Sequence, residues 1–462
     1  TLLLYYTKKY PFVISMPETE FIEKVAEAPA KVLEKTVEAS EKISEKVGEA
    51  FRVKKVKGFW HKLGPGLTTG AADDDPSGIV TYSQVGARFG LQMLWTAPFL
   101  YVLMATIQEM CARIGIVTGR GLAGNIRKHF SKKILITLTA LLFFANTLNI
   151  GADIGAMAKV TQLLVPQLGF GFLVVGITIF SMLLQIYLPY KKYAAFLKYL
   201  TLILFSYILV AFMVALDWRA VLHASIFPTV LFNKEFLLLF CAICGTTISP
   251  YLFFWQTSQE VEDKVSKDVH PRDIRKMRLD VWVGMFISNT VMFFIITTTS
   301  ATLHRAGIFN IQTAEQAAQA LRPLAGDFAY LLFAIGIIGT GFLAIPVLAG
   351  GVSYAFAESY LWKEGLNRKL KDAYAFYGVL IIAMVVGLLI NFIGIDPIHA
   401  LIYSAVINGL LAPIIIVFVI LISSNKEVMG KYVNNTIQKI IGWGVFGLMS
   451  LAGIGAIVVS LI

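Results

Sequence analysis

The stretch Ala71-Ala72-Asp73-Asp74-Asp75-Pro76-Ser77-Gly78 lies in the middle of an apolar segment that is long enough to cross a membrane. Charged side chains at membrane depth usually face the interior of a helix bundle and mark the path of an ion or a substrate. A proline and a glycine interrupt a helix and free backbone carbonyls, which is tolerated there only where they line a cavity. Carboxylate and carbonyl oxygens favour hard cations. The stretch therefore predicts a transporter of metal ions.

The composition independently indicates a membrane protein. Hydrophobic residues make up 57% of the 462-residue chain and charged residues only 15%, which excludes an ordinary soluble domain of this length. The net charge of +11 does not indicate a nucleic-acid partner, because the basic residues lie in short loops between apolar segments. We therefore expect the protein to lie in a lipid bilayer.

The hydrophobic pattern predicts an all-α polytopic membrane protein with about eleven spans of roughly 20 apolar residues each. The third and the eighth are longer than a bilayer requires, so we expect them to tilt or protrude. The predicted spans are 64–84, 91–117, 134–165, 169–188, 195–216, 237–259, 281–303, 327–358, 373–392, 398–422 and 440–462.

The distribution of Lys and Arg predicts the orientation. These residues concentrate in alternate loops. With the N-terminus inside, the inner loops carry about four times as many Lys and Arg residues as the outer loops. We therefore expect a multi-pass protein of the plasma membrane with a cytoplasmic N-terminus and an external C-terminus.

Residues 1–57 form a different segment, which precedes the transmembrane domain at 58–462. From about Pro17 to Phe51 the chain is rich in Glu, Lys and Ala, and apolar residues follow a helical period, beginning with Phe21 and Val25. This pattern predicts a cytoplasmic leader that is amphipathic or partly disordered. A helix that lies on the membrane surface or binds a partner is the alternative.

A second interrupted span lies five spans after the first. The segment Cys244-Gly245-Thr246-Thr247-Ile248-Ser249-Pro250-Tyr251 places a glycine, a hydroxyl cluster and a proline inside the sixth apolar run. Interrupted segments at matching positions of two halves are typical of inverted-repeat transporters, whose ion site lies where the two breaks meet. Because five is odd, the two halves must have opposite orientations.

These residues carry a resemblance to a known family. Gly64-Pro65-Gly66, Asp75-Pro76-Ser77-Gly78, the segment Arg113–Gly119 and the Ser249-Pro250 break resemble the Nramp family of divalent metal transporters. The resemblance extends over about residues 58–462, and within the family the chain looks most like the Nramp-related magnesium transporters. It implies a LeuT-like 5+5 inverted repeat with broken helices 1 and 6, a midplane divalent-cation site and alternating access. It implies neither an enzyme nor a cofactor.

The departures from the main Nramp pattern bear on the transported ion. Proton-coupled members carry Asp-Pro-Gly-Asn in the first break and Met-Pro-His in the second, whereas Gly78 and Ser249 stand here at the asparagine and methionine positions. Without a soft thioether every expected ligand is oxygen, and the pocket is roomier, which suits a partly hydrated Mg²⁺. Mn²⁺ would still fit. The expected ligands are the Asp75 carboxylate, the carbonyls of Ala72, Thr246 and Gly78, and the hydroxyl of Ser249.

Departures in the third and sixth spans bear on proton coupling. The resemblance places Asn149 and Ala152 where proton-coupled members carry acids, and Tyr251 where they carry a histidine. Amide and hydroxyl side chains do not titrate near neutral pH, so we expect uncoupled import. Asp153 weakens this expectation, because a realignment of the third span would restore an acid. A proton-coupled Mn²⁺/Fe²⁺ symporter is the alternative.

Other polar residues have several interpretations. Asp73 and Asp74 are direct ligands, vestibule charges that attract cations, or carboxylates satisfied by helix-end amides. Tyr251, Asn408 and Asn149 are candidates to surround the ion without touching it. Cys241 and Cys244 form a Cys-x-x-Cys that is better explained by packing than by a metal or redox pair.

Two remote alternatives belong to other function classes. An intramembrane aspartyl protease needs two carboxylates on different spans that share a proton, whereas here three adjacent acids lie at one break. A cation channel would use the same site without alternating access, but the paired breaks favour a transporter. The sequence does not determine the oligomeric state, and we expect a monomer.

Overall fold

The computed structural model describes residues 18–37, 64–187, 202–263 and 269–461, and within these ranges it contains helices and turns but no strand. Within the described ranges, eight helical segments are long and apolar enough to cross a membrane, judged by length and composition, and the divided segment Lys234–Asp263 is one of them. Two shorter apolar helices and the broken first span account for the other predicted spans. The prediction of an all-α polytopic membrane protein is confirmed.

The membrane-crossing helices follow the predicted order. Short helical turns that are not α-helical are labelled η. The third and eighth spans, α8 and α18, are 33 and 32 residues long, as their hydrophobic runs predicted. The elements are α4 (Pro65–Asp73), α5 (Pro76–Phe89), α6 (Thr96–Thr118), α8 (Lys132–Leu164), α9 (Phe170–Tyr187), η3 (Leu202–Phe205) with α11 (Ser206–Met213), α13 (Lys234–Thr247), α14 (Pro250–Asp263), α15 (Pro271–Thr299) with η4 (Ser300–His304), α18 (Ala329–Tyr360), α19 (Tyr374–Ile390), α20 (Pro397–Ser424) and α22 (Thr436–Leu461).

The first and sixth spans are each divided into two half-helices. α4 ends at Asp73 and α5 begins at Pro76, so the chain is not helical at Asp74 and Asp75. α13 ends at Thr247 and α14 begins at Pro250. Each second half begins with a proline, whose fixed φ suits the first turn of a helix and whose missing N–H costs no hydrogen bond there. Both predicted breaks are confirmed.

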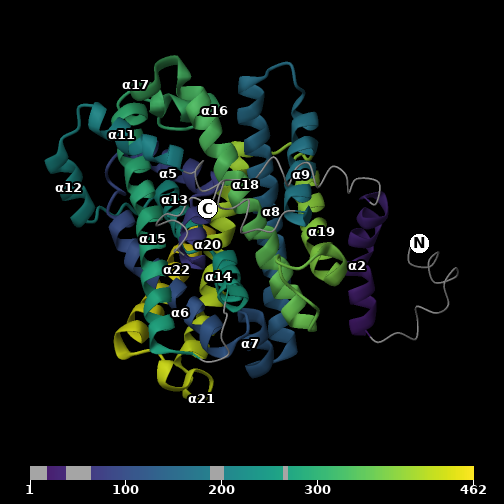
Figure 1. The fold of residues 1–462 in the computed structure, drawn as a ribbon. Coiled ribbons are helices and arrows are strands. Elements are labelled where there is room, and N and C mark those ends of the chain that lie inside the picture. Colours follow the sequence, from purple (N-terminus) through teal and green to yellow (C-terminus); the bar gives the residue numbers. More distant parts are fainter. Residues whose placement is uncertain (1–17, 38–63, 188–201, 264–268, 462) are drawn as a thin grey trace.

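The short helices between the spans lie at opposite ends of the bundle. α7 (Leu122–His129) and α21 (Lys426–Met429), which belong to basic loops, lie at one end (Figure 1). α16 (Ala314–Ala318) and α17 (Arg322–Ala325) lie at the other end, and α12 (Trp218–Ile226) lies on the flank of the same half of the bundle (Figure 1). The loops therefore alternate between two ends as the span count predicted, although their short helices were not foreseen. The remaining turns are η5 (Gln319–Leu321), η6 (Gly326–Phe328), η7 (Leu370–Asp372) and η8 (Gly430–Tyr432).

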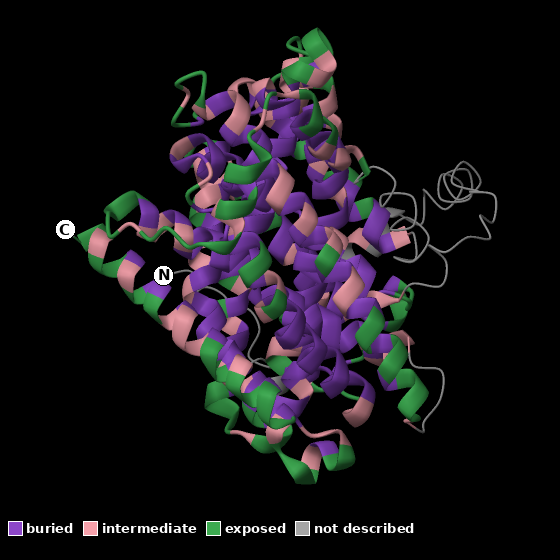
Figure 2. Cartoon of the chain, turned by 90° about the vertical axis from the view of Figure 1, so that its left-hand side faces the viewer, coloured by how far each residue is buried: buried purple, intermediate pink, exposed green. Residues whose placement is uncertain are grey.

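Buried residues fill the centre of the bundle and exposed residues lie on its outside (Figure 2). Many of the exposed residues are large and apolar. Phe172 on α9 and Leu451 on α22 are 70% and 72% exposed. A large exposed apolar surface is unusual for a soluble protein, but it is expected where lipid replaces water.

Small residues set the closest helix contacts. A Cβ added to Gly70 of α4 would lie 2.4 Å from the carbonyl oxygen of Gly284 on α15. A Cβ added to Gly245 of α13 would lie 2.0 Å from the carbonyl oxygen of Ala405 on α20. Backbone-to-backbone packing through small residues is a major means of helix association in lipid. One half of each broken helix therefore packs closely against a continuous neighbour.

The N-terminal segment contains the helix α2 (Glu18–Val37), and the rest of residues 1–57 lies outside the described ranges. α2 lies beside α19 (Figure 1), where the Ala26 carbonyl oxygen approaches Gly378 so closely that a Cβ there would clash. Phe21 and Val25 of the predicted apolar stripe are 46% and 51% exposed, whereas the small residues Ala26 and Ala30 are buried.

Candidate ion site at the two helix breaks

Asp75 lies at the start of α5 and is 1% exposed. Its Oδ1 accepts hydrogen bonds from the backbone N–H of Gly78 at 2.7 Å and from the hydroxyl of Ser77 at 2.8 Å. A carboxylate at this position satisfies the free amides of a helix N-terminus and is stabilised by the helix dipole. Ser77 and Gly78 of the Asp-Pro-Ser-Gly sequence therefore supply the hydrogen bonds that hold the Asp75 carboxylate.

The second carboxylate oxygen of Asp75 faces other helices. Its Oδ2 accepts a hydrogen bond from Nδ2 of Asn149 at 3.0 Å and lies 3.4 Å from the hydroxyl of Tyr251. The hydroxyl of Ser404 on α20 donates to Oδ1 of Asn149 at 2.6 Å, which fixes the orientation of the amide. Asp75 therefore contacts residues of α8 and α14, as the meeting of the two breaks requires.

The predicted ligands of the first break lie around the same carboxylate. The carbonyl oxygen of Ala72, in the last turn of α4, is 3.5 Å from the hydroxyl of Tyr251. Gly78 reaches Asp75 through its N–H, and a Cβ on Gly78 would lie 3.2 Å from Oγ1 of Thr246 and 3.3 Å from the carbonyl oxygen of Asp73. The glycine therefore allows the two breaks to approach each other.

The predicted ligands of the second break, Thr246 and Ser249, are hydrogen-bonded to each other. Ser249 donates its hydroxyl to the carbonyl oxygens of Thr246 at 2.7 Å and of Gly245 at 2.8 Å. Oγ1 of Thr246 lies 3.5 Å from the hydroxyl of Ser77 on α5. The oxygen of Ser249 retains lone pairs that can face a cation, because a hydroxyl is both a donor and an acceptor.

The two other acids of the first break point toward α15. Oδ2 of Asp73 accepts a hydrogen bond from Ser288 at 2.7 Å, and Oδ1 of Asp74 lies 3.2 Å from the same hydroxyl. Both residues are buried, and Oδ1 of Asp73 has no hydrogen-bond partner. These two acids therefore contact α15 through Ser288, whereas Asp75 contacts Asn149 and Tyr251.

Asp153 is the strongest polar feature that the predicted site omitted. It lies one helical turn from Asn149 on α8, is 0% exposed, and neither of its carboxylate oxygens has a hydrogen-bond partner. Residues four apart share one face of a helix, and Asp153 interacts electrostatically with Asp75. Two signals in the sequence pointed to it, namely its place among apolar residues of a long span and its closeness to the acid positions of the family segment.

A chain of polar contacts on the two half-helices was also not predicted. The hydroxyl of Thr69 on α4 lies 2.5 Å from Oε1 of Gln256 on α14, whose Nε2 donates to Glu260 at 2.8 Å. All three residues are buried. Asn408, a candidate neighbour of the ion, is also buried, and its Oδ1 has no hydrogen-bond partner.

The electrostatics of the break favour a cation. Among the described residues, no Lys or Arg side chain pairs with Asp73, Asp74 or Asp75. No group of three or more His, Cys, Asp or Glu side chains in the described ranges has the geometry of a metal site. A site with one inward carboxylate and several neutral oxygens fits an ion that keeps part of its water, as Mg²⁺ does.

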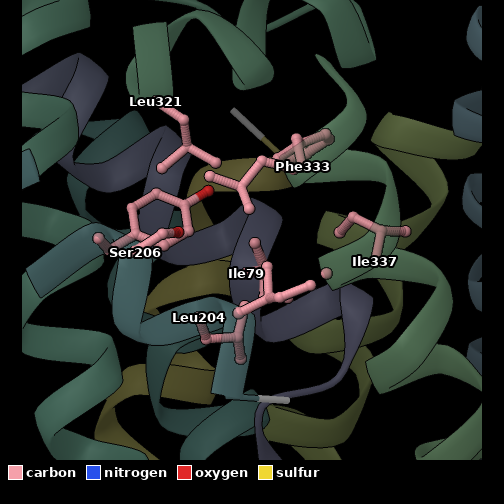
Figure 3. A pocket seen from close by; sticks show the side chains of 10 residues that line it. Ile79, Leu204, Ser206, Leu321, Phe333 and Ile337 are labelled. Carbon is pink, nitrogen blue, oxygen red and sulfur yellow. The ribbon is translucent and has the colours of Figure 1, made fainter. Parts of the chain in front are cut away.

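The apolar space near α5 is not part of this site. It lies between Ile79, Leu204, Phe333 and Ile337 and has no room for a water molecule (Figure 3). It reflects the packing of α5 against η3 and α18, and it offers no charged group to an ion.

Comparisons with known proteins show to which family the chain is similar. Residues 66–459 match the model of the Nramp family, natural resistance-associated macrophage protein-like. The chain is 25% identical over 397 residues to the divalent metal cation transporter MntH of Caldanaerobacter subterraneus, covering 84% of this chain and 90% of the relative. It is 26% identical over 386 residues to MntH of Yersinia enterocolitica, covering 82% and 90%.

Solved structures confirm the predicted fold class. The Eremococcus coleocola manganese transporter superposes with a TM-score of 0.69 at 19% identity, covering 87% of this chain and 88% of the other. Mhp1, a nucleobase-cation-symport-1 family transporter in a closed conformation, superposes with a TM-score of 0.56 at 14% identity, covering 86% and 91%. The chain therefore has the LeuT-like architecture with broken first and sixth helices.

Proposed function

Because this chain belongs to the Nramp family, whose members are transporters and not enzymes, we propose that it imports divalent metal ions, Mg²⁺ and also Mn²⁺, by alternating access. The observation that carries the proposal is the Asp75 carboxylate, buried where the two helix breaks meet and supported by Gly78, Ser77 and Asn149. The names of its relatives, divalent metal cation and manganese transporters, support the ion class.

In this proposal the ion is held by oxygen atoms only. Asp75 supplies the charge, and the carbonyls of Ala72, Thr246 and Gly78 with the hydroxyl of Ser249 supply neutral oxygens. Ser249 and Gly78 stand where larger side chains of proton-coupled relatives are expected, so the site has no thioether that would favour a soft metal. Asp73 and Asp74 act as charges near the path, while Tyr251, Asn149 and Asn408 surround the ion.

We further propose that import is driven by the membrane potential without proton coupling. A potential of 100 mV contributes about 2.3 kcal/mol per charge, hence about 4.6 kcal/mol for a dication. This is on the order of a thousandfold accumulation. Asn149 and Tyr251 contact Asp75 but cannot carry protons near neutral pH.

A second candidate function is proton-coupled transport of Mn²⁺ or Fe²⁺. The observation that favours it is Asp153, a buried carboxylate without a hydrogen-bond partner near Asp75. The Asp153 carboxyl group can bind and release a proton, whereas the amide of Asn149 cannot. The two functions differ in whether protons accompany the metal.

We place the protein in the plasma membrane with its N-terminus in the cytoplasm and its C-terminus outside, as the basic loops predict. It requires no cofactor, and a monomer contains both breaks and hence the whole proposed site. Its partners are then metal ions and lipid.

The decisive experiment uses purified protein in liposomes that enclose a Mg²⁺-sensitive dye, with a pH-sensitive dye in a parallel preparation. The proposed function predicts Mg²⁺ influx that responds to an imposed potential, saturates with concentration and disappears in Asp75→Ala. Single-channel currents would instead indicate a channel. Mn²⁺ influx with accompanying acidification, and no Mg²⁺ influx, would establish the second candidate.

A further inference from the structure

A cavity of about 510 Å³ opens at the end of the bundle where α6 and α18 stop. Cavities of this volume are typical of small-molecule sites. Its wall includes Arg120, Arg127 and Lys128 from the turn after α6 and from α7, and Glu358, Trp362 and Glu364 from the end of α18 and the turn that follows. This is the end that carries α7 and α21 (Figure 1), and no residue of either helix break lines the cavity.

Three basic side chains and two acids determine the charge balance of this cavity. Within the described part of the chain, no carboxylate forms an ion pair with Arg120, Arg127 or Lys128. The nearest candidate, Glu358, is already engaged, because it accepts hydrogen bonds from the N–H of Gly124 at 2.7 Å and from the hydroxyl of Ser258 at 2.8 Å. The Glu358 carboxylate therefore accepts a hydrogen bond from the first turn of α7 instead of forming an ion pair with a basic side chain.

The second acid of the wall does not cancel the positive charge at neutral pH. Burial, reinforced by the charges of Glu358 and Glu262 and opposed by Arg368, raises the pKa of Glu364 to about 9. Its Oε2 is buried without a hydrogen-bond partner. A protonated carboxylic acid is a neutral hydrogen-bond donor, so Glu364 adds a donor to the cavity and the wall keeps a net positive charge.

We propose that this cavity binds a phosphate group, carried by a soluble molecule or by a lipid head group, with Arg120, Arg127 and Lys128 as its cationic contacts. The planar guanidinium groups of arginine match phosphate oxygens with paired hydrogen bonds, and lysine supplies a point charge. Trp362, which is largely buried and stacks on Tyr360 with ring centroids 5.1 Å apart, offers an apolar wall to the rest of the ligand.

The proposal is tested with full-length purified protein in detergent without added lipid. Equilibrium binding is measured with inorganic phosphate and with ATP, both in EDTA so that metal binding does not contribute. In a separate arm, native mass spectrometry counts bound phosphatidylglycerol against phosphatidylcholine. We expect saturable binding of a phosphate-bearing probe. Binding of phosphate or ATP alone identifies a soluble ligand, and selective retention of phosphatidylglycerol alone identifies a lipid.

The matched variants are Arg127→Gln/Lys128→Gln and Lys132→Gln/Lys133→Gln. Both remove two charges from exposed residues of neighbouring helices, but only the first pair lines the cavity. We expect at least about tenfold weaker binding in the first variant, equivalent to about 1.4 kcal/mol, and wild-type binding in the second. Equal losses in both variants, or no saturable binding of any probe by the wild-type protein, would overturn the proposal. The measurement does not depend on transport, so its result is independent of the ion site.

Discussion

Nδ2 of Asn149 lies 3.0 Å from Oδ2 of Asp75, and it is held there because Ser404 donates to the other end of the same amide. α5, α8 and α20 are thereby joined through one neutral side chain. An acid in place of Asn149 would repel Asp75, whereas an amide supports its negative charge. Donation from the Asn149 amide favours the ionised form of the buried Asp75 carboxylate, which the proposed ligand role requires.

The first prediction concerns Asp75 itself. Asp75→Ala removes the only carboxylate of the proposed ligand set, so Mg²⁺ flux in liposomes should fall to the level of empty vesicles. Asp327→Ala, at an exposed position in η6, serves as the matched control and should transport normally. Substantial Mg²⁺ flux through correctly inserted Asp75→Ala protein would contradict the assignment.

The second prediction concerns the support of Asp75. Asn149→Leu removes a donor without introducing a charge, and loss of such a supporting contact typically weakens metal affinity about 10- to 100-fold. The KM for Mg²⁺ should therefore rise while the protein remains folded, and Asn149→Gln should restore part of the affinity. An unchanged KM in Asn149→Leu would mean that the contact does not support ion binding.

The third prediction concerns selectivity. Ser249→Met with Gly78→Asn should shift preference from Mg²⁺ toward Mn²⁺ or Cd²⁺ by on the order of tenfold, because a thioether favours softer metals. Thr246 must move by a few tenths of an ångström, since a Cβ on Gly78 would lie 3.2 Å from its Oγ1. Competition of Mn²⁺ and Cd²⁺ with Mg²⁺ influx measures the shift, and wild-type selectivity in the double variant would show that ligand softness does not set it.

The fourth prediction concerns protons. The rate of Mg²⁺ influx should depend on an imposed membrane potential and be independent of an imposed pH gradient. The lumenal pH should stay unchanged during influx. Asp153→Asn should not alter these results, because the proposed transport does not use that carboxyl. Acidification that accompanies influx and disappears in Asp153→Asn would establish Asp153 as a proton carrier.

The fifth prediction concerns helix packing. Gly284→Val should lower the thermal midpoint, since crowding of a packed interior typically costs about 1 to 3 kcal/mol, and Gly70 of α4 contacts the backbone at this position. Gly444→Val on α22, where an added Cβ would meet nothing within 4 Å, is the control. Equal thermal midpoints for the two variants would refute the tight α4–α15 contact.

The sequence was sufficient for the fold because hydrophobic length and helix breakers act locally. Runs of apolar residues predicted α8 and α18 with their unusual lengths, and Pro76 and Pro250 predicted where the half-helices begin. The family resemblance singled out Asp75. The packing of the leader was harder to predict, because Ala26 and Ala30 are buried in a helix that lies beside α19, where the Ala26 carbonyl approaches Gly378.

Contacts between distant segments could not be read from the pattern. The direction in which Asp73 and Asp74 point depends on Ser288, more than 200 residues away. The family resemblance left the register of Asp153 open, and its burial without a hydrogen-bond partner is seen only in the folded bundle. The chain from Thr69 through Gln256 to Glu260 likewise exists only after the two half-helices meet.

The close contact of Gly245 with Ala405 affects how natural variants of this protein should be interpreted. Neither backbone needs to touch the ion, yet any side chain at position 245 would force α13 away from α20. A single methyl group there should disable the carrier as effectively as a change at Asp75, while leaving every proposed ligand in the sequence intact. A harmful substitution in this membrane domain is therefore not by itself a sign of an ion-binding residue.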